Sequence, residues 1–74
     1  MTNIPVLKAR DIVRKIRKLG FYFTRQKGNH AIYRRASDST RITIPIHGGT
    51  DIAPAILFQI IEDAGISREE FLNL

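Results

Sequence analysis

The sequence predicts an α+β fold in which two helices cover one face of a three-stranded antiparallel sheet, with a short helix at the C-terminal end. Apolar residues recur at helical spacing near both ends of the chain and alternate along three segments between them. Short turns join these three segments, as expected for antiparallel neighbours. With 74 residues, the chain has room for one domain, residues 1–74.

The first helix is expected over residues 8–19, where the apolar side chains fall on one stripe. That stripe consists of Ile12, Val13, Ile16 and Leu19. Basic residues occupy the other faces, and those near the end of the helix suit the negative end of its dipole. Gly20 is expected to end the helix, because glycine readily adopts the left-handed conformation found there.

The second helix is expected over residues 54–64. Pro54 suits a first helical turn, and Gly65 is a strong C-terminal signal. The stripe of this helix consists of Leu57, Ile60, Ile61 and Ala64. The residues from Ser67 to Glu70 match a capping box, which predicts a short last helix that packs back on the domain.

The three strands are expected at residues 21–26, 30–35 and 41–45. Strict alternation places Phe21, Phe23 and Arg25 on one face of the first strand, and both phenylalanines are expected in the core. In the second strand both faces are partly apolar, so alternation leaves open which face His30 takes.

The positive charge is concentrated in the first part of the chain. The net charge of the chain is +5. Residues 1–41 carry 11 basic and two acidic side chains, a net charge of +9. Residues 42–74 carry one basic and five acidic side chains, a net charge of −4. Such a field attracts polyanions, above all nucleic acid. Basic surfaces are also typical of ribosomal proteins and membrane-surface helices, so charge alone does not choose the partner.

Several classes of site and location are disfavoured by composition. The chain has no cysteine, which removes disulfides and thiolate metal sites and fits a reducing compartment. Its two histidines lack acidic residues at ligand spacing, and no nucleotide-binding glycine motif is present, so we expect neither a metal nor a cofactor. No apolar stretch approaches the ~20 residues needed to span a bilayer. We expect a soluble, cytoplasmic protein without membrane association.

The hairpin between the first two strands is the candidate site. Gly28 and Asn29 suit a tight turn, in particular one with glycine at its first central position, and His30 opens the next strand. The neighbouring cations are Arg25, Lys27, Arg34 and Arg35. Fixed cations can hold a phosphate while an imidazole moves a proton near neutral pH. This combination suits chemistry on a phosphodiester.

A specific reaction follows from these residue types. His30 would take the proton from a ribose 2′-hydroxyl, which attacks the adjacent phosphorus and leaves a 2′,3′-cyclic phosphate; this route needs no metal. Lys27 and Arg34 would steady the phosphate, and Arg25 would support the turn or the RNA backbone. Alternatively, His30 is a polar residue of the turn, bonded to backbone.

Three further side chains have open roles. His47, between Ile46 and two glycines, is either a second acid–base group or phosphate contact, or an incidental surface histidine. Tyr22 and Tyr33 either stack bases on an open sheet face or are half-buried, as strand tyrosines often are.

Taken together, several motifs resemble the HicA toxins, small bacterial messenger-RNA interferases of toxin–antitoxin pairs. These motifs are Leu19-Gly20-Phe21, Arg25-Gln26-Lys27-Gly28-Asn29-His30, Ile32-Tyr33-Arg34, Ile42-Thr43-Ile44-Pro45-Ile46-His47, Pro54 and Ile60-Ile61-Glu62-Asp63-Ala64-Gly65-Ile66. The resemblance covers nearly the whole chain. It implies a fold like the double-stranded-RNA-binding domain, in the order α-β-β-β-α.

The resemblance also implies a function. It implies that the protein cleaves RNA and that the histidine of the family's Gly-Ser-His motif is essential for cleavage. That histidine corresponds to His30. It also implies a HicB-like antitoxin that masks this histidine. The family often has a histidine at the place of His47. Asn29 stands where the family usually has serine, but asparagine also fits the turn and forms hydrogen bonds. The second helix begins without the lysine cluster that binds duplex phosphates, which favours single-stranded or messenger RNA. The alternatives are a non-catalytic RNA-binding or antitoxin-binding module and, less favoured, a structural protein of a ribonucleoprotein particle.

Overall fold

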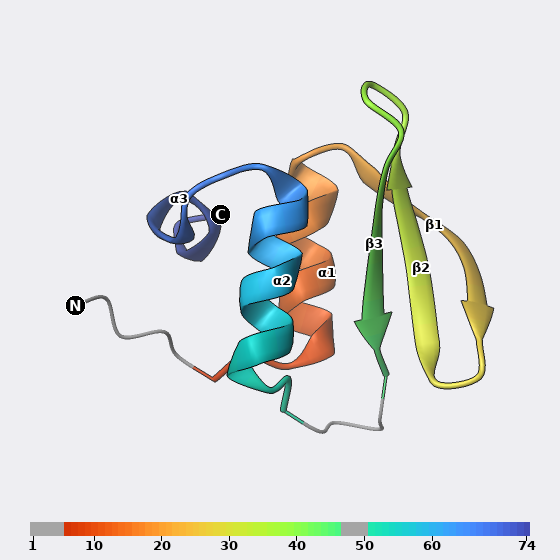
Figure 1. The fold of residues 1–74 in the computed structure, drawn as a ribbon, viewed down its shortest axis with the longest axis horizontal. Helices are drawn as coiled ribbons and strands as arrows, with labels where there is room; N and C mark the ends of the chain where they lie inside the picture. Colours follow the sequence, from red (N-terminus) through yellow and green to blue (C-terminus); the bar gives the residue numbers. More distant parts are fainter. Residues whose placement is uncertain (1–5, 47–50) are drawn as a thin grey trace.

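The computed structural model of the chain describes residues 6–46 and 51–74. Its elements, in order, are α1 (Ala9–Lys18), β1 (Phe21–Lys27), β2 (His30–Arg35), β3 (Thr40–Pro45), α2 (Pro54–Ala64) and α3 (Arg68–Leu72) (Figure 1). The predicted α+β class and element order are confirmed, and each predicted strand and long helix ends within one residue of the observed position.

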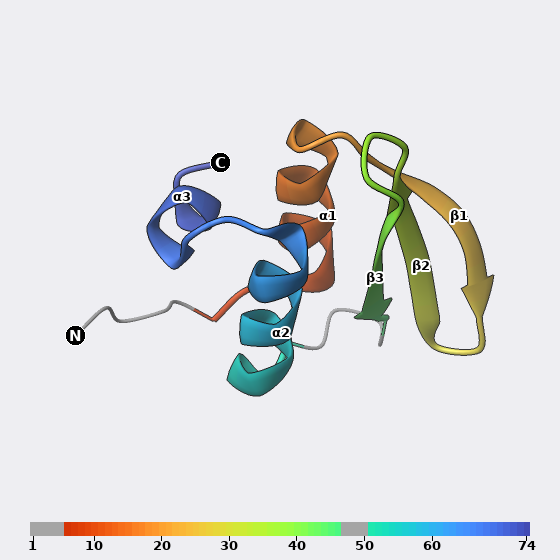
Figure 2. The same ribbon diagram turned by 45° about the horizontal axis from the view of Figure 1, so that its top comes forward.

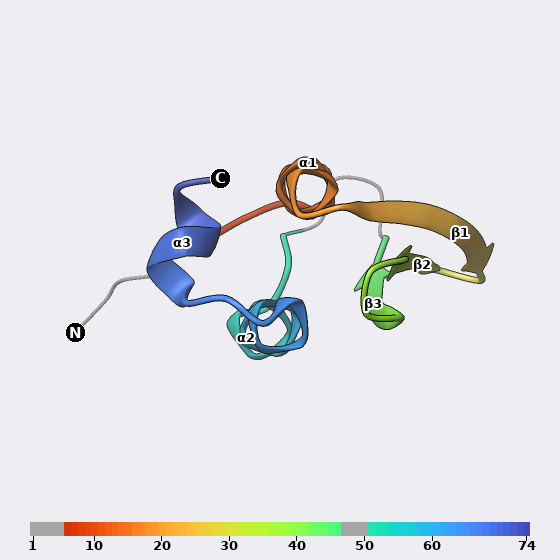
Figure 3. The same ribbon diagram turned by 90° about the horizontal axis from the view of Figure 1, so that it is seen from above.

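The molecule has two main layers. The strands form one antiparallel sheet in the order β1-β2-β3, and both long helices lie on the same side of it (Figure 3). α2 packs mainly against β3 and α1 against β1. The short α3 lies beyond the long helices, away from the sheet (Figure 1, Figure 2). The other face of the sheet carries no helix in the described part of the chain.

The hydrophobic core lies between the helices and the sheet. Its buried side chains are Ile12, Ile16, Phe21, Ala31, Tyr33, Ile42, Ile44, Ile52, Leu57, Ile60, Ile61, Ala64 and Phe71. Fully burying a side chain such as isoleucine or leucine contributes roughly 1.5–3 kcal/mol. Most of the stabilising burial is therefore on the helix side of the sheet, which leaves the opposite face available for binding.

The predicted ends of the helices are confirmed. Gly20 and Gly65 have φ of +95° and +77°, the left-handed conformation that glycine adopts without strain. Ser67 Oγ accepts a hydrogen bond from the Glu70 backbone N–H at 3.1 Å, and the Glu70 carboxylate accepts one from the Ser67 N–H in return. This capping box starts α3, which buries Phe71 against the core.

The predicted face of Arg25 is wrong, because β1 contains a β-bulge. Phe23 pairs with Tyr33 and Arg25 pairs with Ile32, so two residues of β1 oppose one of β2 and Thr24 has no partner. The Thr24 hydroxyl donates to the Ile32 carbonyl at 2.8 Å, which holds the bulge closed. The bulge reverses the alternation, so Arg25 lies on the opposite face of the sheet from Phe21.

The prediction that Phe23 belongs to the core is also wrong. Its side chain is 48% exposed, although its ring meets Tyr33 edge-on at a centroid distance of 5.7 Å. α1 lies beside the start of β1, and β1 then extends away from both helices (Figure 3). Because neither long helix follows the strand outward, Phe23 is only partly covered.

Candidate nucleic-acid interface

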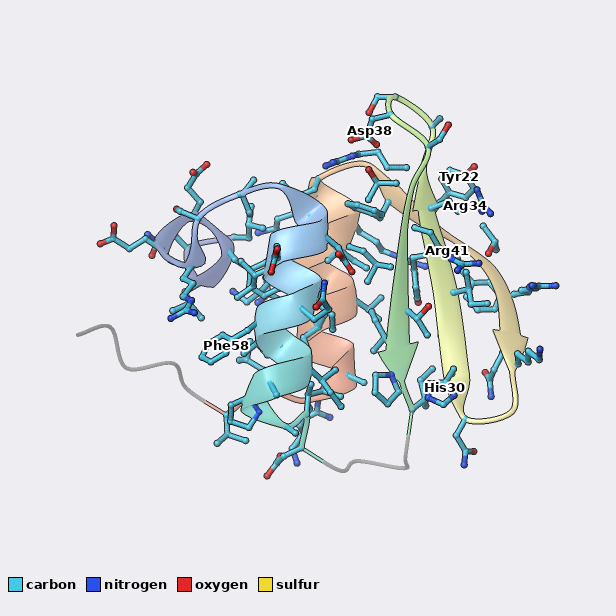
Figure 4. The ribbon with its side chains drawn as sticks, in the orientation of Figure 1. Tyr22, His30, Arg34, Asp38, Arg41 and Phe58 are labelled. Carbon is cyan, nitrogen blue, oxygen red and sulfur yellow. The ribbon has the colours of Figure 1, made fainter. Side chains whose placement is uncertain are left out.

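The face of the sheet opposite the helices, called the open face below, collects most of the candidate residues. Pairing across the three strands arranges it in three rows: Tyr22, Arg34 and Arg41; Arg25, Ile32 and Thr43; Lys27, His30 and Pro45. In Figure 4 Tyr22, Arg34 and Arg41 lie on the side of the strands away from the helices. The apolar side chain of Ile32 is only 8% exposed even on this face.

A tight turn fixes the position of His30. Gly28 has a φ of +59° whereas Asn29 has a negative φ, so glycine occupies the first central position of a two-residue turn, as in type II′ hairpins. The Gln26 side-chain amide donates to the Gly28 carbonyl at 3.0 Å. The Asn29 carbonyl accepts from the Ile46 N–H at 2.6 Å, which ties the turn to the end of β3.

His30 lies on the open face, which answers the question that alternation left open. It pairs with Lys27 on one side and Pro45 on the other, and it is exposed (Figure 4). Its imidazole forms no hydrogen bond or ion pair with any residue among 6–46 and 51–74. The backbone-bonded alternative therefore has no supporting contact in this part of the chain.

Two cations lie close to the imidazole, and a third lies farther along the strand. Lys27 is directly opposite His30, where Cβ atoms of paired residues are about 4.5–5.5 Å apart. Arg25 is in the next row, on the same face because of the bulge. Arg34 is four residues from His30 along β2, about 13 Å at the usual rise per residue. None of the seven acidic residues belongs to a strand, so the open face has a positive potential.

Residues 9–66 match the family model described as HicA toxin of bacterial toxin-antitoxin. The chain belongs to the HicA toxin family. The match runs from α1 past the end of α2 and includes all three rows of the open face. The protein is thus a toxin of a toxin–antitoxin system, a class in which each toxin has a cognate antitoxin. The comparison with curated proteins found no match.

Arg35 of this HicA family member lies on the helix side of the sheet, unlike Arg25, Lys27 and Arg34. Its guanidinium donates to both carboxylate oxygens of Asp38, at 3.1 and 2.8 Å, and also to the carbonyls of Leu19 and Ala64. The guanidinium also lies over the Phe21 ring, 4.5 Å from its centroid. Arg35 thus joins the β2–β3 turn to the ends of α1 and α2, and we leave it out of the proposed phosphate-binding set.

The two tyrosines that the sequence suggested for base stacking in this HicA toxin lie in different surroundings. Tyr22 is 49% exposed on the open face, where a base could stack on it. Tyr33 is buried in the core and cannot stack on a base. His47 lies outside the described residues, and its role stays a prediction. No group of three or more His, Cys, Asp or Glu side chains suited to a metal ion occurs among the described residues. No helix there has the length and apolar character to cross a membrane.

Sequence reasoning missed Arg41 and Thr43 as members of the open face. Arg41 pairs with Arg34, and Thr43 pairs with Ile32. The signal was present in the alternation of β3, because Ile42 and Ile44 point into the core and their neighbours must point outward.

Proposed function

We propose that this toxin is a metal-independent endoribonuclease that cleaves messenger RNA, with His30 as its general acid–base. One observation carries the proposal: an exposed imidazole faces Lys27 across a hairpin, with Arg25 in the adjoining row of the same face. Membership of the HicA family supports it, because this family's toxins are generally ribonucleases.

The reaction begins when neutral His30 accepts the proton of a ribose 2′-hydroxyl. The 2′-oxygen then bonds to the adjacent phosphorus while the bond from phosphorus to the 5′-oxygen breaks. That 5′-oxygen takes a proton from the imidazolium or from water, so the products are a 2′,3′-cyclic phosphate and a 5′-hydroxyl. General acid–base catalysis of this kind typically contributes about 10²–10⁴-fold to the rate.

Lys27 and Arg25 stabilise the negative charge that builds up on the non-bridging phosphoryl oxygens. Arg34 is too far along β2 to reach the same phosphate as closely and holds a neighbouring phosphate instead. His47, for which we keep the role of second acid–base group or phosphate contact, completes the proposed set.

Single-stranded RNA is the proposed substrate. The open face offers Tyr22 for base stacking beside a row of cations. α2 contains no basic residue, whereas duplex binding relies on cations that contact phosphates on both sides of a groove. The cognate antitoxin is proposed to be HicB-like and to cover His30.

The test incubates the purified toxin with end-labelled single-stranded RNA in excess EDTA and analyses the fragment ends. We expect wild type to release fragments with cyclic-phosphate or 3′-phosphate ends and His30→Ala, with an unchanged circular dichroism spectrum, to release none. Asn29→Ser, which restores the usual family residue beside the histidine, is the matched control and should cleave at least as fast as wild type.

A second candidate function, a non-catalytic RNA-binding or antitoxin-binding module, is favoured only by the asparagine at position 29. It requires that wild type leaves RNA intact, and cleavage by Asn29→Ser alone would identify the asparagine as the cause. Cleavage by His30→Ala at the wild-type rate would contradict the assignment of the histidine.

A further inference from the structure

A groove of about 380 Å³ lies between the β3 edge of the sheet and α2. Arg41 and Thr43 form its wall on the strand side, and α2 contributes Ile56, Gln59 and Asp63 to the other side. Since Arg41 and Thr43 also belong to the open face, the groove adjoins the surface that carries His30.

The groove has an apolar contact between two polar walls, one with hydrogen-bond donors and the other with hydrogen-bond acceptors. Ile56 is 39% exposed and gives a flat ligand an apolar surface to lie on. On the strand side, the Arg41 guanidinium and the Thr43 hydroxyl supply hydrogen-bond donors.

On the helix side, the groove presents acceptors. The Gln59 amide nitrogen donates to Asp63 Oδ1 at 2.9 Å, which orients the amide and leaves the Gln59 carbonyl and Asp63 Oδ2 as acceptors. No ion pair among the described residues joins Arg41 to Asp63. Both residues line the groove without pairing with each other, so each keeps hydrogen-bonding capacity for a ligand.

We infer that this groove binds a guanine base of the RNA substrate, an inference that rests on the proposed function. Guanine presents the acceptors N7 and O6 on one edge, which suit the Arg41 guanidinium. Its N1–H and N2–H₂ donors lie on the adjacent edge and suit Asp63 and the Gln59 carbonyl, while Ile56 contacts the face of the ring. Of the four RNA bases, guanine alone combines two neighbouring donors with two neighbouring acceptors.

The register of the sheet places this guanine near the cleaved bond but not at it. Arg41 pairs with Arg34, the residue proposed to hold a neighbouring phosphate, and that row lies about 13 Å from His30. Arg34 would hold a phosphate of the strand while Arg41 and Asp63 read a base beside it. The groove would thus favour cleavage of RNA near a guanine.

The test measures binding of wild-type toxin to fully 2′-O-methylated uridine hexamers that carry one central guanine or one central adenine. These probes cannot be cleaved through a 2′-hydroxyl, so the result does not depend on catalysis. We expect the guanine probe to bind about tenfold more tightly than the adenine probe, within the range of a good bidentate base contact. Asp63→Asn should reduce this ratio to about twofold or less.

Glu62→Gln is the matched control, because Glu62 is exposed on α2 next to Asp63 but does not line the groove. It should keep the wild-type ratio. Equal affinity of wild type for the two probes, or an unchanged ratio in Asp63→Asn, would overturn the inference. Guanine preference without any RNA cleavage would instead remove the proposed nuclease activity and leave the base site standing.

Discussion

At the scale of single residues, the two neighbouring arginines of β2 have opposite roles. Arg34 lies on the open face, where a cation can reach a phosphate. Arg35 binds Asp38, two helix-end carbonyls and the Phe21 ring on the other face. Adjacent strand residues point to opposite faces. Arg34 is therefore available to a ligand, whereas Arg35 contributes to stability.

The Arg35–Asp38 pair gives stability a dependence on pH. Hydrogen bonds from the Arg35 guanidinium, and then from Thr40, hold the pKa of the Asp38 carboxyl well below its usual range. In the unfolded chain this pKa is about 3.9. Below about pH 4 the unfolded state therefore binds more protons than the folded state. The stabilisation that the Asp38 carboxylate provides is lost as the pH falls through this range.

We expect the melting temperature of wild type to fall more steeply than that of Asp38→Asn below about pH 4. At neutral pH the variant should melt at a lower temperature, because it lacks the charge that Arg35 pairs with. Thermal unfolding monitored by circular dichroism across this range measures both quantities. Parallel pH profiles for the two proteins would contradict this account of Asp38.

At the scale of elements, the bulge in β1 decides which cations accompany the histidine. Without an extra residue at Thr24, Arg25 would point toward the helices, as strict alternation predicts. With the bulge, Arg25 lies in the row next to His30 and Lys27. Bulges are known to re-aim side chains beside active sites, and this one adds a cation to the open face.

Thr24→Val should lower both stability and cleavage. The variant keeps a β-branched side chain but loses the hydroxyl that donates to the Ile32 carbonyl, a bond of about 1 kcal/mol. In a domain of this size that corresponds to a fall of roughly 4–8 °C in melting temperature. Because the bulge also aims Arg25, RNA cleavage should decrease as well. Thr24→Ser keeps the hydroxyl and should retain most of both properties; equal losses in the two variants would disprove the role of this bond.

The elements themselves follow from the sequence, whereas the faces of β1 do not. Helical periodicity, the glycines after α1 and α2, and the Ser67 capping box predicted the helix positions because these signals are local. The turn at Gly28 was predicted for the same reason. The bulge has no local signature in the residues around Thr24, and the exposure of Phe23 depends on where the helices stop covering the sheet.

The residues of the candidate site likewise differ in how far local sequence signals predict them. His30, Lys27 and Arg34 could be proposed from their proximity to the hairpin. Arg41 comes from another strand and depends on the pairing register. Asp63 comes from α2, far along the chain, and nothing near it in the sequence points to the groove.

At the scale of the whole molecule, the hydrophobic core and a cationic surface occupy different sides of one sheet. The core fills the helix side, and the open face carries Arg25, Lys27, Arg34 and Arg41 without an acidic residue on any strand. The acidic residues of the chain lie instead on helices, turns and loops. A polyanion approaching the toxin should therefore bind with the strand side facing it.

The salt dependence of RNA binding should report these cations. Three to four phosphate contacts predict that log K falls with log salt with a slope of about −2 to −3 for single-stranded RNA. Arg34→Gln should bring the slope closer to zero by about 0.7, whereas Arg10→Gln, on α1 at the helix side, should leave it unchanged. Fluorescence anisotropy with a 2′-O-methylated RNA over a series of salt concentrations measures the slope. An identical effect of the two substitutions would mean that binding is not localised on the open face.

The bulge at Thr24 also bears on how toxin molecules behave toward one another. β1 and β3 are the two edges of an open sheet, and a regular edge strand is a template on which a second chain can pair and begin to aggregate. The bulge interrupts the regular row of backbone groups along β1, and Pro45 removes one donor from β3. The distortion that turns Arg25 toward the open face therefore also makes β1 a poorer template for edge-to-edge pairing.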